Sequence, residues 1–189
     1  MFVESTDLLE DALAWKEIHP RHEIGNAALD ALTRNGQLLN WNRRLIEHEL
    51  DLADDLLCDF NAGCPELFAT PGSNLEMSEG DYSALLEERY DWVLTHSIGL
   101  NHPIFCNPTA LQRISVGPED ISDVLDTMED AIEKGAWCIL CFDLRSDVVR
   151  RFHDAFIEVV PNSLADVLWQ PVGRIGSLIS AFRSNLTLR

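Results

Sequence analysis

A short apolar run at residues 136–142 constrains the fold of this chain more than any other feature. It reads Ala-Trp-Cys-Ile-Leu-Cys-Phe and is bounded by Gly135 and Asp143. An apolar run of this length between a glycine and a polar residue is typical of a buried strand. One strand cannot satisfy its own backbone hydrogen bonds, so it needs partner strands. The sequence therefore predicts a small sheet around this run, with weak candidate partners at residues 67–69, 103–106 and 185–189.

The segments on either side of the run predict helices. Pro118 suits the first helical position, and Lys134 followed by Gly135 favours a helix end, so we expect a helix over residues 118–134. Ser146 can cap a second helix. Pro161 should end this second helix, because proline lacks the backbone N–H and clashes with the preceding turn.

The rest of the chain also reads mainly as helix. Apolar residues at helical spacing predict helices over residues 7–18, 23–34, 37–60, 81–96 and 175–182. A length of 189 residues fits one domain of ordinary size. We therefore expect a single globular domain, 1–189, of the mainly α (α+β) class: a helical domain with a small sheet built around one buried strand near 136–142.

The charge balance is strongly acidic. The chain has 14 Lys and Arg residues against 32 Asp and Glu residues, which gives a formal net charge of −18. Proteins that hold nucleic acid neutralise its phosphates with Lys and Arg. The composition therefore argues against direct nucleic-acid binding and favours a basic protein as the partner.

The acids gather on two of the predicted helices. After Gly117, spacings of four and three residues place five carboxylates in one stripe: Glu119, Asp123, Asp126, Asp130 and Glu133. The helix over residues 37–60 carries a second group: Glu47, Asp51, Asp54 and Asp55. Like charges at these spacings destabilise an isolated helix by roughly 0.2–0.5 kcal/mol per pair. We predict that both groups bind a basic partner; the simpler alternative is that they are solvated faces.

The sequence contains none of the common catalytic or cofactor motifs. We find no Gly-x-Ser-x-Gly elbow, no phosphate-binding Walker sequence and no Gly-x-Gly-x-x-Gly. Cys138 and Cys141 have the spacing of a zinc knuckle, but no second ligand pair follows, and residues three apart in a strand point to opposite faces. We therefore expect no catalytic residue, no metal site and no cofactor. The enzymatic alternative is an irregular site near His96, His102 and Cys106.

Several features favour a cytoplasmic protein. Its five cysteines are odd in number and irregularly spaced, as expected of free thiols in a reducing compartment. The first eleven residues contain four acids and no base, unlike a secretory signal. The longest apolar run has seven residues, whereas a bilayer-spanning helix needs about 20. We expect no membrane contact, and the sequence does not indicate an oligomeric state.

Three functional hypotheses follow from these observations. The favoured one is a non-enzymatic inhibitor that masks a basic surface of a partner protein, such as an immunity protein or antitoxin bound to its toxin. A chaperone or adaptor for a secreted or scaffold protein would share the acidity but should also expose an apolar groove. An enzyme with a non-obvious His/Cys site is the third hypothesis.

Overall fold

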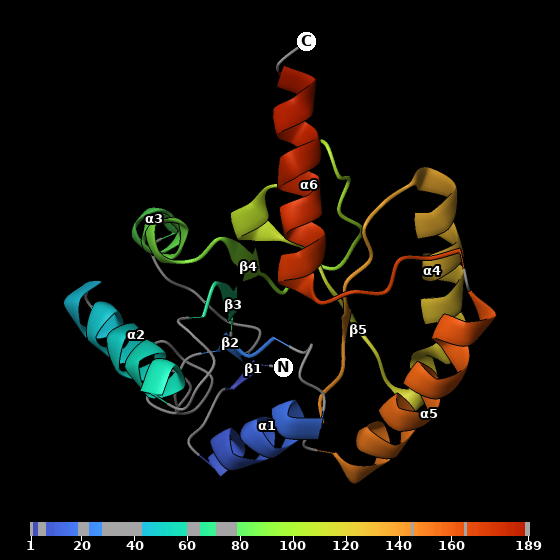
Figure 1. Ribbon diagram of the computed structural model, residues 1–189, viewed down its shortest axis with the longest axis horizontal. Coiled ribbons are helices and arrows are strands. Elements are labelled where there is room, and N and C mark those ends of the chain that lie inside the picture. Colours follow the sequence, from blue (N-terminus) through green and yellow to red (C-terminus); the bar gives the residue numbers. More distant parts are fainter. Residues whose placement is uncertain are drawn as a thin grey trace. The chain divides into compact units, whose positions relative to one another are not determined.

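The computed structural model describes residues 2–3, 7–18, 23–27, 43–59, 65–70, 79–144, 146–164 and 166–187. Over these residues the chain forms six α-helices and six short strands, arranged in a four-stranded and a two-stranded sheet (Figure 1). This confirms the predicted class, a mainly helical α+β protein with little sheet. In the described part of the chain, no helix is both long enough and apolar enough to cross a membrane.

Residue contacts divide the chain into two compact units. Unit 1 consists of Met1–His96, Asn107–Leu111 and Pro171–Leu178, and unit 2 consists of Ser97–Cys106, Gln112–Gln170 and Ile179–Arg189. The units alternate along the chain, so no single cut in the sequence separates them. The prediction of one domain over residues 1–189 stays a prediction.

Unit 1 is organised around a parallel sheet. Its strands, β1 (Phe2–Val3), β2 (Gly25–Asn26), β3 (Leu67–Ala69) and β4 (Trp92–Leu94), lie in sequence order. Parallel neighbours need a crossover connection, and the helices α1 (Asp7–Ile18), α2 (Arg43–Leu57) and α3 (Glu79–Arg89) lie in these connections.

Two of these strands correct the sequence-based prediction. The helix expected over residues 23–34 begins where the structure has β2, and its residues 28–34 lie outside the described part. The helix expected over residues 81–96 ends early, at Arg89, and its last apolar residues form β4. Trp92, Val93 and Leu94 are all buried, as in a strand of a parallel sheet covered on both faces. Such a strand gives a continuous apolar run that periodicity cannot separate from a buried helix.

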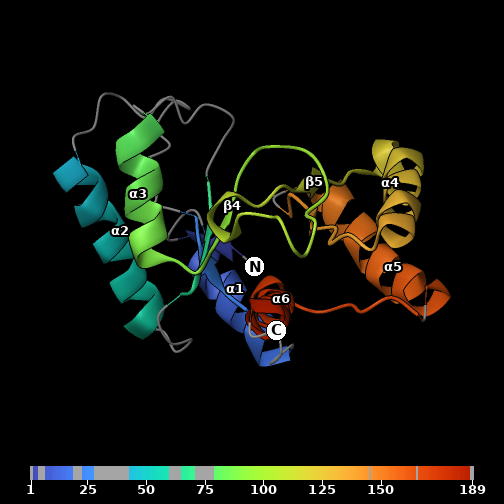
Figure 2. The same cartoon turned by 90° about the horizontal axis from the view of Figure 1, so that it is seen from above.

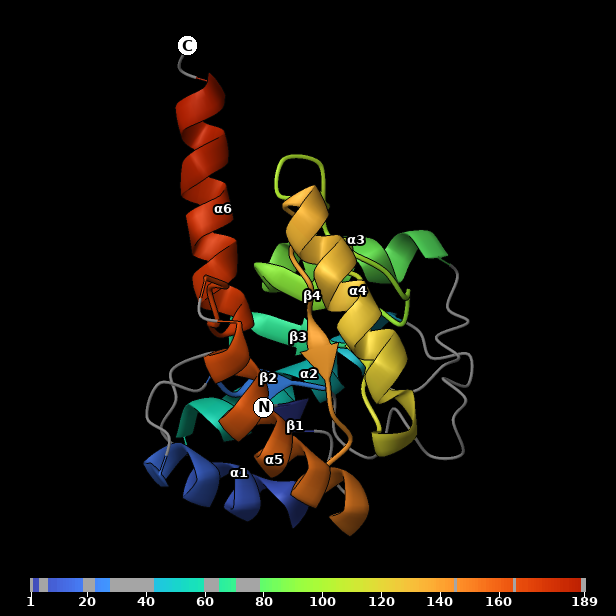
Figure 3. The same ribbon diagram turned by 90° about the vertical axis from the view of Figure 1, so that its right-hand side faces the viewer.

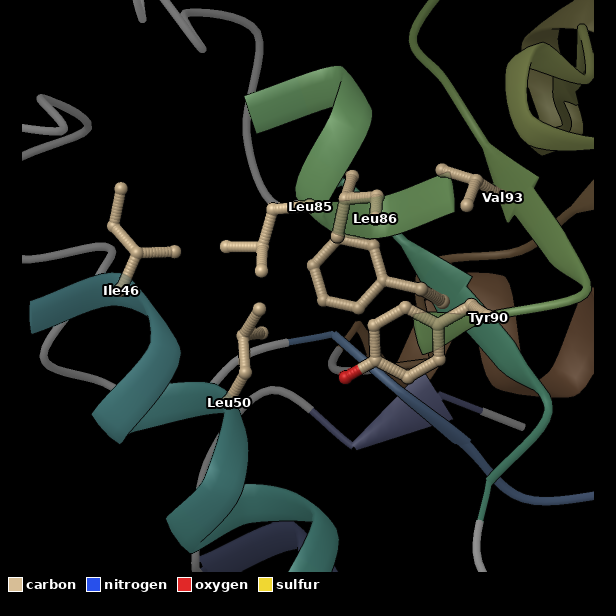
Figure 4. Packing of buried hydrophobic residues seen from close by; sticks show 7 residues of the cluster. Ile46, Leu50, Leu85, Leu86, Tyr90 and Val93 are labelled. Atoms are coloured by element: carbon tan, nitrogen blue, oxygen red, sulfur yellow. The ribbon is translucent and has the colours of Figure 1, made fainter. Parts of the chain in front are cut away.

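The core of unit 1 lies between the sheet and its helices. Ile46 and Leu50 of α2 face Leu85 and Leu86 of α3, and Tyr90 and Val93 lie beside them (Figure 4). The helices α2 and α3 therefore run side by side on this core (Figure 2).

Unit 2 contains the helix–strand–helix segment that the sequence predicts. Its strands β5 (Ile114–Ser115) and β6 (Leu140–Cys141) are parallel. The connection between them holds the 3₁₀ turn η4 (Pro118–Asp120) and the helix α4 (Ile121–Lys134), which is labelled in Figure 3. The core of unit 2 joins α4 to α5 (Asp147–Ser163) through apolar residues from both helices and from the strand segments: Ile114, Val116, Val124, Met128 and Phe156.

The run at residues 136–142 forms a shorter strand than expected. Only Leu140 and Cys141 are in β6, and both are half-buried, whereas Ile139 is buried. Of the candidate partner strands, 67–69 does form a strand, β3, although it belongs to the other sheet. The strand prediction at 103–106 is wrong, because this region forms a turn. The strand prediction at 185–189 is wrong for residues 185–187, which lie in α6 (Val172–Thr187), and residues 188–189 lie outside the described part.

Two further helix ends differ from the sequence-based prediction. The helix α5 continues past Pro161 to Ser163, and the N–H of Leu164 donates to the carbonyl of Val160, so the proline lies inside the last turn. The helix α6 begins three residues before the expected start at residue 175. A Cβ at Gly176 would lie 2.5 Å from the Trp92 ring, so glycine permits this close contact within unit 1.

Candidate interaction surface

The five-carboxylate stripe near α4 faces solvent. Pro118 starts the 3₁₀ turn at the expected place, and α4 follows directly to Lys134. One face of α4 is buried through Val124, Met128 and Ala131. The acids of the stripe repeat at helical spacing but are offset by roughly half a turn from these buried residues. They therefore lie on the opposite face of α4. Four of its carboxylates are exposed: Glu119, Asp123, Asp126 and Glu133.

Among the described residues, the stripe has one ion pair. Lys134 Nζ lies 2.7 Å from Asp130 Oδ2; the Lys134 side chain is exposed and that of Asp130 is half-buried. An exposed pair at this i,i+4 spacing contributes about 0.3–0.5 kcal/mol. Lys134 is also the only basic residue between positions 119 and 134. The stripe is therefore a nearly uncompensated negative surface.

The acids of α2 have different surroundings, because basic residues of unit 1 lie against three of them. Arg43 Nε donates to Glu47 Oε1 at 2.6 Å. Arg89 Nη2 lies 2.7 Å from Asp51 Oδ1 and 2.9 Å from Asp54 Oδ2. Asp55 is exposed. Three acids of the predicted α2 group thus contact arginines of unit 1, and the fourth, Asp55, faces solvent.

Asp54 belongs to a buried polar network between α2, β2 and the short segment that joins α3 to β4. Its Oδ1 accepts from Asn26 Nδ2 at 2.8 Å, and the Tyr90 hydroxyl lies 3.0 Å from each of its carboxylate oxygens. Asn26 also donates to the Tyr90 oxygen at 3.0 Å. The exposed fractions of Asn26 and Tyr90 are 0% and 2%. These hydrogen bonds hold α2 against the sheet. Within this described part of the chain, the Nε of Arg89 is buried without a hydrogen-bond partner.

The surroundings of Tyr90 and Arg89 raise the pKa values of both side chains. Burial raises the pKa of Tyr90, and the adjacent Asp54 carboxylate raises it further, so the phenol stays protonated. Burial lowers the pKa of Arg89, but hydrogen bonds to Asp54 and Asp51 outweigh this effect and raise that pKa above its usual value. Asp54 and Arg89 are therefore a charged structural pair.

The cysteines near β6 lie in apolar surroundings. Cys138 packs against the core of unit 2, and burial raises the pKa of its thiol to about 11. The Cys141 sulfur accepts a weak contact from Arg113 at 3.9 Å. In the described parts of the chain, no three His, Cys, Asp or Glu side chains are grouped as a metal site. A thiol that remains protonated at neutral pH is a poor nucleophile.

The segment around His102 and Cys106 is a tight turn tied to α6. Arg183 donates to the carbonyls of Pro103 and Cys106 at 2.7 and 2.8 Å, and to the Cys106 sulfur at 3.1 Å. His102 stacks on Phe105 at 4.9 Å, and its Nδ1 accepts from the N–H of Ile104. The contacts of this segment thus hold the turn together. His96, the other residue of the enzymatic alternative, is exposed just after β4 in unit 1.

Sequence reasoning missed two polar residues that organise unit 2. Asn101 is 2% exposed, donates to the carbonyl of Gln112 and accepts from its N–H. Arg183 closes the turn described above. Neither residue lies in a motif, and each acts on a segment distant in the sequence. The only available signal was the surrounding irregular stretch, which needs side-chain caps for its backbone groups.

The fold and this surface define a class of protein, an acidic α+β protein with one helix face of carboxylates that has a single ion pair among the described residues. No protein family, no curated protein and no solved structure matches the chain.

Proposed function

We propose that this chain is a non-enzymatic, cytoplasmic binding protein that masks a basic surface of a partner protein, in the manner of an immunity protein or antitoxin. One observation carries the proposal: α4 and its preceding turn present five carboxylates on one face, with one ion pair among the described residues. The contrast with α2 supports it, because three of the four α2 carboxylates are paired with arginines.

Repulsion between the like charges of the stripe destabilises α4. A face that only needs to be solvated does not require charges of one sign. A solvated helix normally mixes lysines with its acids, which adds favourable i,i+4 pairs. A one-sign face instead raises the rate of encounter with a basic partner and disfavours acidic partners. This is the property that a fast-binding inhibitor needs.

An adaptor function is the second candidate, because unit 2 also exposes large apolar side chains. The exposed fractions of Phe105, Phe182 and Leu186 are 79%, 48% and 46%. An adaptor would use such residues to hold an amphipathic segment of its client. The partner's chemistry separates the two candidates, since an inhibitor of this type requires a basic protein.

The test is capture of the partner from the native host, followed by kinetics with the purified pair. The triple variant Asp123→Asn, Asp126→Asn and Asp130→Asn preserves size and removes three charges. It should slow association at least about tenfold at low salt, and the difference should shrink near about 0.5 M salt because screening removes steering.

A matched control removes the same charge elsewhere. Glu66→Gln, Asp91→Asn and Asp166→Asn replace three exposed acids outside both predicted stripes. This control should leave the association rate within about twofold of the original. Equal slowing by the two triple variants would assign the effect to net charge, and unchanged association in the stripe variant would remove the basis of the proposal.

A further inference from the structure

The helix α4 exposes two aliphatic side chains next to its carboxylates. The exposed fractions of Leu125 and Ile132 are 39% and 48%. They are seven residues apart, which is about two helical turns, so they lie on one side of α4 roughly 10 Å apart along its axis. Single exposed aliphatic residues are common. Two aligned on an otherwise acidic face form a defined row.

The position of this row follows from helical spacing. Glu129 lies four residues after Leu125 and three before Ile132, so it belongs to the same row. Asp126 directly follows Leu125, and Glu133 directly follows Ile132. Both acids belong to the acidic stripe. On the other side of the row is the buried face of α4 that packs into the unit 2 core. The aliphatic row therefore borders the acidic stripe along two turns.

An apolar row beside charged groups has the composition of a protein interface. Apolar anchors that lose contact with water slow dissociation, whereas charges at the rim speed encounter. The charges also select the occupant. Residues 119–134 contain seven acids and one base, Lys134, which is already paired with Asp130. An acidic partner would be repelled, and a purely polar basic partner would leave Leu125 and Ile132 in water.

We propose that this face of α4 docks a basic amphipathic helix of the partner, with Leu125 and Ile132 as its apolar anchors. The inference rests on the proposed function and names the chemistry of its partner. The docked helix carries apolar residues at i, i+3 or i+4, and i+7, which match the two-turn spacing of the anchors. Lysines or arginines beside that stripe lie against the carboxylates from Glu119 to Glu133.

The experiment uses the full chain and a defined probe, a synthetic amphipathic helix of leucine and lysine labelled for fluorescence anisotropy. A second peptide has the same composition in an order that spreads the leucines around the helix. The wild-type chain should bind the first peptide at least about tenfold more tightly than the second, because only the first presents an apolar stripe.

The double variant Leu125→Ser and Ile132→Ser should raise the Kd for the amphipathic peptide at least about tenfold. The control is Val148→Ser and Val159→Ser on α5, where the exposed fractions are 65% and 59%. This control should change the Kd by less than about twofold. Since all four residues are exposed, thermal unfolding should show that both double variants fold.

The outcomes separate this inference from the proposed function. If the Asp123, Asp126 and Asp130 triple variant weakens binding but Leu125→Ser with Ile132→Ser does not, the acidic face binds basic partners and the apolar anchors are overturned. Equal binding of the two peptides overturns the anchors as well. If neither variant weakens binding, both the inference and the proposed function fail.

Discussion

At the scale of single residues, neighbouring carboxylates on α2 have opposite roles. Asp54 and Asp55 are adjacent in the sequence, yet Asp54 accepts from Asn26, Tyr90 and Arg89 while Asp55 is exposed. The difference follows from helix geometry, because adjacent residues point about 100° apart. Asp54 is therefore a structural residue, although its charge and spacing resemble those of a surface acid.

This contrast gives a matched pair of substitutions. Asp54→Asn should lower the free energy of unfolding by about 2 kcal/mol, because it leaves the partly buried Arg89 without one of its carboxylates. Asp55→Asn should change it by less than about 0.5 kcal/mol. Urea denaturation of both variants measures the two effects. Equal effects would mean that the network contributes nothing to stability.

Cys138 should make stability depend on alkaline pH. Burial raises the pKa of its thiol to about 11, from an ordinary value of 9.0. Between these values the unfolded chain loses the proton while the folded chain keeps it, so stability falls as the pH rises. The loss should be below about 2 kcal/mol, because the site is partly screened by solvent.

The measurement is the free energy of unfolding at pH 9 and pH 11 for the wild-type chain and for Cys138→Ala. The wild-type chain should lose more stability than the variant over this interval. A loss of the same size in both proteins would show that other groups account for the alkaline effect.

At the scale of elements, the long amphipathic helices were predictable and the short strands were not. The expected helix over residues 7–18 is α1, and Pro118, Lys134 and Gly135 mark the ends of η4 and α4. A helix builds its periodic signal over many residues. Strands of two or three residues, such as β2 and β5, are too short for any period. Their pairing depends on contacts between distant segments, which local sequence does not encode.

The segment around β6 gives a prediction at this scale. Ile139 is 5% exposed, whereas Leu140 is half-buried and packs against the core of unit 2. Ile139→Ala should therefore destabilise the protein by about 2–5 kcal/mol through a cavity, and Leu140→Ala by a smaller amount. Denaturant unfolding measures both changes. A larger loss for Leu140→Ala would show that the contact of Leu140 with the unit 2 core outweighs the deeper burial of Ile139.

At the scale of the whole molecule, the net charge of −18 opposes folding, because compaction brings like charges together. Screening should relieve this repulsion. Raising the ionic strength from about 0.01 M to about 0.15 M shortens the Debye length from roughly 30 Å to 8 Å. The stability of the chain should therefore increase with salt.

We expect Tm to rise by at least about 2 °C over this range. The rise should be smaller in the Asp123, Asp126 and Asp130 triple variant, which lacks part of the repulsion. Calorimetry at several salt concentrations measures both. A fall in Tm with salt would show that surface ion pairs, such as Arg43 with Glu47, outweigh the net repulsion.

The sequence alone determined the acidity of the chain, the class of fold and the stripe from Glu119 to Glu133, because composition and helical spacing are local properties. Tertiary structure decided which acids remain exposed. Arg89 lies 35 residues after Asp54 and turns that carboxylate inward, and Arg183 closes a turn 77 residues earlier in the sequence. Such pairings follow from how helices and strands pack together, so no local pattern predicts them.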